Sequence, residues 1–166
     1  MDEKLLFGLG TEDNERISKE EVIPGTRDLH HLAGYRTPLT VQSLALQIID
    51  DIRLGVPETR SFRLIRQFVM DFERACDDKA LLLECTPPLT GVRYIDSMIA
   101  GLAEHLAFHS GLKVPAWTRE ADRYMKLPWF GFQLEHEVVH VHAMLRGPIS
   151  LRNHGIFIDS SSFVNI

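Results

Sequence analysis

The sequence feature with the clearest chemistry is a pair of histidines four positions apart with a glutamate after the first: His136, Glu137 and His140. On a helix, side chains four positions apart lie on one face, so both imidazoles can bind one zinc ion. The glutamate can then activate a zinc-bound water. These residues are the candidates for a zinc-dependent hydrolase.

The surroundings of this HExxH motif lack the remaining ligand in its usual place. The extended motif continues with a glycine and a third histidine, where this chain has Ala143 and Arg146. Asp159 is the one carboxylate after the motif, and His154 is a further candidate ligand. A catalytic zinc takes three protein ligands and keeps one open position. We therefore predict that the motif binds no metal, and keep the zinc-dependent hydrolase as the alternative function.

A second pair of histidines, His105 and His109, has the same spacing, with Glu104 beside it. Two such pairs on neighbouring helices can bind a metal inside a helical bundle. Half-buried histidines with glutamate partners produce the same pattern. We predict the latter arrangement, and expect no catalytic residue, metal or cofactor.

The two cysteines, Cys76 and Cys85, lack the CxxC spacing of redox and zinc motifs. Both lie in or next to apolar segments, so we predict two buried, reduced thiols in a reducing compartment. Nucleophile-elbow, Walker and dinucleotide-binding motifs are missing from the sequence.

Both tryptophans follow a proline in two short segments, Val-Pro-Ala-Trp and Leu-Pro-Trp-Phe. Proline fixes the backbone there and tryptophan supplies a large contact area, so these corners can attach the connecting segments to the core. Tryptophan is also enriched at binding hot spots, and basic residues lie between the corners. We predict a partner-binding surface with a basic rim, formed by Trp117, Arg119, Arg123, Trp129 and Phe130.

Apolar residues recur at helical spacing along most of the chain after Pro38. They predict helices over residues 39–54, 61–77, 92–110, 118–125 and 132–145, and a last turn over residues 148–152. Residues 79–85 form a short apolar segment, and residues 156–158 form a strand or a buried tail. Without a convincing strand pair, the fold class is all-α: a single-domain bundle of five or six helices over residues 39–166. Glycines and prolines interrupt residues 1–38, which we expect to be an irregular, acidic arm or linker.

The composition is that of an ordinary globular domain: 166 residues, of which 45% are hydrophobic and 25% charged. No apolar run is long enough to span a membrane, and no secretory signal is evident, so we expect a cytoplasmic protein. The net charge is -5, and lysines and arginines form no dense cluster. Nucleic-acid binding through this chain alone is therefore not expected.

The stretch from Phe62 onward resembles a group of mostly uncharacterised actinobacterial proteins. The similarity covers about 60% of the chain and lies in residues 86–91, 99–107, 111–117, 128–130 and 152–159, with LAEHLAFHSGLKVPAW as its most specific piece. In that group, the segment often follows an Xre-type helix-turn-helix domain. Its genes often neighbour genes for nucleotidyltransferase-type toxins.

The resemblance implies an antitoxin or regulator that binds a toxin-like nucleotidyltransferase. This chain differs from the group in two ways: its first 60 residues show no clear helix-turn-helix, and its histidine-rich residues 135–142 replace the usual linking segment. We predict a non-enzymatic protein-interaction module, with a DNA-binding regulator as a third interpretation. Whether the protein also forms a homo-oligomer stays open.

Overall fold

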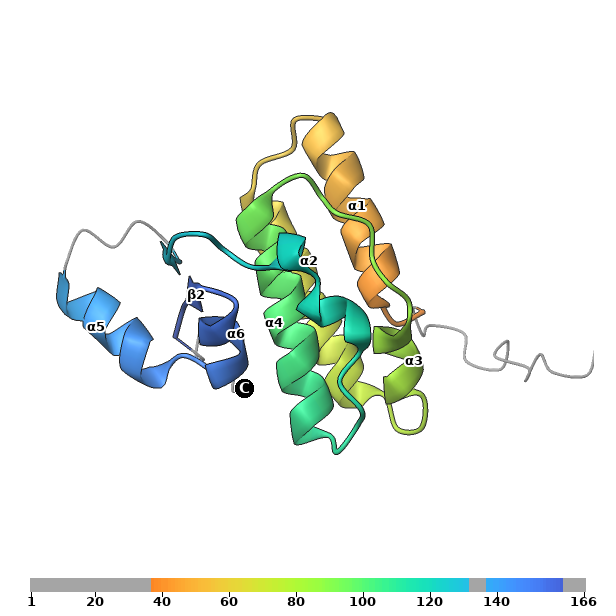
Figure 1. Cartoon of the computed structure of the whole chain (residues 1–166). Coiled ribbons are helices and arrows are strands. Elements are labelled where there is room, and N and C mark those ends of the chain that lie inside the picture. The colour runs from red at the N-terminus through yellow and green to blue at the C-terminus, as the bar shows by residue number, and fades with distance from the viewer. Residues whose placement is uncertain (1–36, 132–136, 160–166) are drawn as a thin grey trace, which may run out of the picture. The chain divides into compact units, whose positions relative to one another are not determined.

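The computed structural model describes residues 37–131 and 137–159 (Figure 1). The chain divides into two compact units, Met1–Arg36 and Thr37–Ile166, and all described residues belong to the second. The prediction of an irregular arm over residues 1–38 therefore falls almost wholly outside the described residues.

The fold is all-α, as predicted. The described residues contain six α-helices: α1 (Val41–Arg53), α2 (Thr59–Arg74), α3 (Lys79–Glu84), α4 (Arg93–His109), α5 (Glu137–Arg146) and α6 (Ile149–Asn153). Two 3-10 helices, η2 (Ala116–Arg119) and η3 (Ala121–Arg123), follow α4. None of the described helices is long and apolar enough to cross a membrane.

Local signals explain where α1 begins and ends. Thr40 and Ser43 form a reciprocal capping box, in which each side chain accepts a hydrogen bond from the other residue's backbone N–H. Val41, Leu44 and Ile48 then place apolar side chains on one face, all of them buried. Gly55 follows the helix with φ 67°, a left-handed conformation that glycine adopts without strain.

Helix α4 lies at the centre of the core. Most of its residues are buried, and it packs against α3, α6 and both 3-10 helices. Gly101 permits the close approach of α6, because a Cβ atom there would lie 2.9 Å from Leu151 Cδ2 and 3.1 Å from its Cα. The segment after α4 and the C-terminal segment are thus attached to the same helix.

One prediction of local structure is wrong, and of the two alternatives for residues 156–158 the structure has the strand. The helix expected over residues 118–125 is instead η2 and η3, joined at Glu120 in an extended conformation. A short parallel strand pair also exists: β1 (Trp129–Phe130) pairs with β2 (Ile156–Phe157), in the register Trp129 to Ile156. The pair consists of two residues per strand, far apart in the chain, and so leaves no periodic signal in the sequence.

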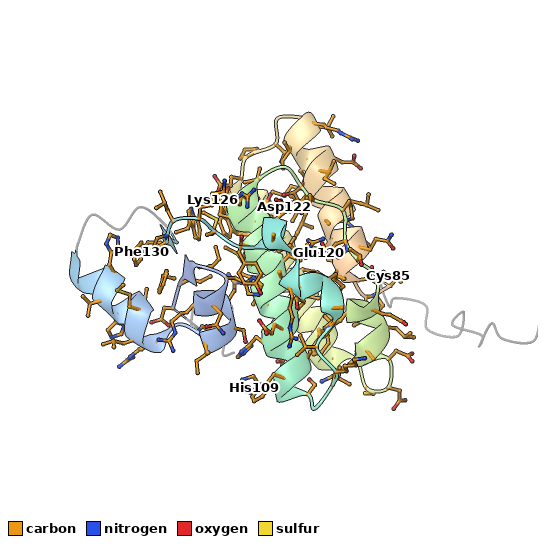
Figure 2. All side chains as sticks on the ribbon, in the orientation of Figure 1. Cys85, His109, Glu120, Asp122, Lys126 and Phe130 are labelled. Carbon is orange, nitrogen blue, oxygen red and sulfur yellow. The ribbon has the colours of Figure 1, made fainter. Side chains whose placement is uncertain are left out.

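The prediction of buried thiols is also wrong. Cys76 and Cys85 are free and exposed (Figure 2 shows Cys85). Each follows the end of a helix: α2 ends at Arg74 and α3 at Glu84, so the apolar face of the helix does not continue to the cysteine.

Candidate functional site

Only part of the HExxH motif lies within the described residues. His136 lies outside the described residues, as does the side chain of Glu137. The His140 ring is half-buried, with its centroid 4.4 Å from that of Phe130. Within residues 37–131 and 137–159, no three His, Cys, Asp or Glu side chains come together in a way that could hold a metal ion.

The second histidine pair lies at the end of α4. The ring centroids of His105 and His109 are 4.3 Å apart. Burial lowers the pKa of His105, and the nearby charge of His109 lowers it further. Both effects favour a neutral His105 imidazole. Glu104, which the sequence places beside this pair, instead contacts a histidine of the C-terminal segment.

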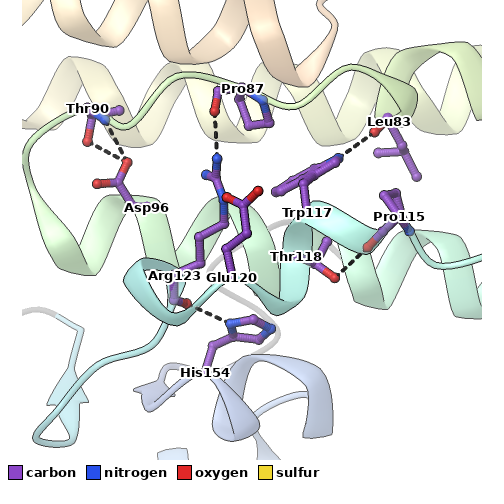
Figure 3. Close-up of polar contacts among 10 residues, drawn as sticks. All are labelled: Leu83, Pro87, Thr90, Asp96, Pro115, Trp117, Thr118, Glu120, Arg123 and His154. Atoms are coloured by element: carbon purple, nitrogen blue, oxygen red, sulfur yellow. Dashed lines mark hydrogen bonds and ion pairs between the residues drawn. The ribbon is translucent and has the colours of Figure 1, made fainter.

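That residue is His154, whose side chain is fully buried. Its Nδ1 lies 2.8 Å from the backbone oxygen of Arg123 (Figure 3). Its Nε2 lies 3.2 Å from Glu104 Oε2. The ring also stacks on Tyr124 with centroids 4.3 Å apart. A carbonyl oxygen can only accept, so Nδ1 carries a hydrogen and donates it. His154 thereby joins the end of α6 to both η3 and α4.

Arg123 is 1% exposed, so the prediction that it lines an exposed basic rim is wrong. Its guanidinium donates to the Pro87 carbonyl at 2.6 Å and to Glu120 at 3.1 Å (Figure 3). It also lies over the Trp117 ring, 4.8 Å from the centroid. These contacts compensate for the burial of the charge and connect the segment before α4 with the one after it.

Trp117 is 4% exposed and belongs to the core cluster. Its indole Nε1 donates a 2.9 Å hydrogen bond to the Leu83 carbonyl at the end of α3. Of the two interpretations of the Pro-Trp corners, Trp117 therefore fits attachment of the connecting segment to the core and not partner binding. A cavity of about 490 Å³ beside it is lined by side chains that include Leu83, Leu112 and Trp117, with Glu84 and Lys113 of opposite charge.

The other three predicted partner-binding residues are at least partly accessible: Arg119 is exposed, and Trp129 and Phe130 are half-buried. Trp129 stacks almost parallel on Tyr94, with centroids 4.7 Å apart and planes 3° apart. Phe130 stacks on Phe157, with centroids 5.1 Å apart. The second corner therefore also packs against its own chain, while part of each ring faces solvent.

Helix α5 carries a surface that sequence reasoning did not identify. Val141, Met144 and Leu145 are 54%, 43% and 74% exposed, and Ile149 at the start of α6 is 67% exposed. We call these four residues the α5 stripe. Ala143 faces the other way and is 4% exposed. The spacing i, i+3, i+4 of the three residues on α5 is typical of a helix face that packs on the core, but here this face is exposed.

Comparisons with protein-family models, curated proteins and solved structures give no match.

Proposed function

We propose that this protein is a non-enzymatic, cytoplasmic protein-interaction module, and that it acts as the antitoxin of a nucleotidyltransferase-type toxin. The observation that carries the binding role is the α5 stripe, four large apolar side chains that are exposed on α5 and at the start of α6. Clusters of this kind on a small domain are typical of surfaces that bind another protein. The resemblance described above supplies the class of partner.

The stripe is large enough to form the centre of an interface. Burying a large aliphatic or methionine side chain completely contributes roughly 1.5–3 kcal/mol, so covering the exposed fractions of these four would contribute about 4–7 kcal/mol. Association costs about 4–15 kcal/mol in lost freedom of motion. Binding therefore needs further contacts around the stripe.

Two groups of residues can supply those contacts. Arg119, Trp129 and Phe130 remain partner-binding residues in this proposal, since each presents some surface to solvent. The acidic residues near the start of the chain would cover a basic nucleotide- or RNA-binding cleft of the toxin. Trp117 and Arg123, which are buried, hold the scaffold together instead.

The experiment that tests this function is co-expression of the tagged full chain with the product of the neighbouring gene, followed by co-purification. We expect a stable complex that Leu145→Asp disrupts. Leu54→Asp is the matched control, because Leu54 is 78% exposed at the end of α1, away from the stripe. Failure of the wild-type chain to form any complex contradicts the proposal. So does stoichiometric zinc that is lost on His140→Ala, which would favour the hydrolase.

A further inference from the structure

The shape of the α5 stripe indicates what kind of surface can cover it. Its residues follow a single helix and the turn after it, with Ala143 and Gly147 buried behind them. The apolar surface is thus a ridge about one helix wide. An amphipathic helix with anchors at this spacing is recognised by an apolar groove in the partner.

A positive charge lies beside the ridge, at Arg146. Arg146 follows His142 by four residues, so both lie along the same side of α5. Arg146 is exposed, and among the described residues it has no ion-pair partner. His142 Nδ1 lies 3.4 Å from Asp159 Oδ2, so this carboxylate already has a partner. A groove that receives this helix would gain from carboxylates on the rim facing Arg146.

The same charge argues against a second copy of this chain as the occupant. In a two-fold pairing each copy presents the same surface to the other. Two antiparallel α5 helices centred on Leu145 would therefore bring the Arg146 sides together, and the two guanidinium groups would repel each other. A self-association through this face lacks the opposite charge that a different protein can provide.

We propose that α5 inserts its apolar ridge into an apolar groove of a partner protein, and that acidic side chains on the rim of that groove pair with Arg146. This inference rests on the proposed function and names the chemistry of the partner surface. Because the ridge supplies contact area and Arg146 supplies charge, the two contributions can be separated by substitution and by salt.

The test uses the full chain and the purified product of the neighbouring gene as the probe. Dissociation constants are measured by calorimetry at low and high sodium chloride. We expect Leu145→Asp and Val141→Asp each to weaken binding by about 100-fold or more, the size of a hot-spot loss. Arg146→Glu should weaken it by about 10-fold at low salt and reduce the salt dependence. Arg66→Glu, at an exposed arginine of α2, is the charge-matched control and should change the constant little.

Each other outcome has a separate meaning. A complex that tolerates both aspartate substitutions overturns the ridge-in-groove inference and leaves the proposed function standing. A complex that depends on Leu145 but tolerates Arg146→Glu, with no salt dependence, overturns the acidic rim. A wild-type homodimer in light scattering that Leu145→Asp dissociates shows that a second copy covers the ridge. No complex at all contradicts the proposed function itself. Circular dichroism of each variant checks that it is folded.

Discussion

Replacing His154 with alanine tests how the C-terminal segment is attached to the core. Its buried imidazole contacts both α4, through Glu104, and η3, through the Arg123 carbonyl. The substitution removes both hydrogen bonds and the stacking contact with Tyr124. It also leaves a space behind Leu151, which packs on the same part of α4.

The expected loss can be built from these contacts. A buried acceptor left without a donor, here the Arg123 carbonyl, costs about 1–3 kcal/mol, and losing an aromatic stack costs about 0.5–1.5 kcal/mol. With the space left by the ring, we expect the free energy of unfolding to fall by about 3–5 kcal/mol. For a domain of this size that corresponds to a Tm lower by roughly 6–20 °C.

Two further variants make the reasoning refutable. His142→Ala removes a histidine whose side chain is 50% exposed and paired with Asp159, so it should cost at most about 1 kcal/mol. Glu104→Gln should also cost less than about 1 kcal/mol, because an amide N–H can donate to Nε2 while Nδ1 still donates to the Arg123 carbonyl. Urea unfolding measures all three. If His154→Ala loses no more stability than His142→Ala, the role assigned to His154 is wrong.

Three more substitutions test particular contacts by urea unfolding. Because the pKa of His105 is lowered in the folded protein, the unfolded chain takes up the proton first as the pH drops. The free energy of unfolding should therefore fall as the pH drops through 6.5, and His105→Gln should make this fall smaller. An unchanged pH dependence in the variant contradicts this role of His105. Thr40→Ala should cost about 1 kcal/mol through the lost α1 cap, and no change would mean that the cap is not stabilising. Gly101→Ala should cost about 1–3 kcal/mol despite alanine's better helix propensity, because its methyl meets Leu151; a stabilised variant refutes this packing.

The helices could be predicted because their signals are local. Val41, Leu44 and Ile48 repeat on one face of α1, and Gly55 and Gly111 take positive φ just after α1 and α4. Both kinds of signal depend on residues within a few positions of one another. The periodicity therefore indicated each helix without knowledge of its neighbours.

The fate of the predicted site residues depended on contacts between distant positions. The burial of Arg123 follows from Pro87, 36 positions earlier, and from the Trp117 ring above its guanidinium. The sequence shows a basic residue near two tryptophans, a pattern equally suited to a surface and to a buried cation-π contact. The α5 stripe is the opposite case: apolar side chains that are exposed rather than a charged one that is buried. Periodicity shows that a helix has an apolar face but not what covers that face.

The buried polar contacts hold the scaffold together, whereas the exposed apolar side chains of the α5 stripe are available to a partner. His154 and Arg123 connect the segments around α4, and β2 contacts both α4 and α5, so the core fixes the place from which α5 presents its stripe. Changes at the two buried residues should then weaken partner binding only as far as they unfold the domain. Changes at Leu145 should weaken binding in a domain whose stability is unaltered. If the scaffold and the contact surface respond to separate substitutions in this way, the result supports the proposal that the protein acts by presenting a surface.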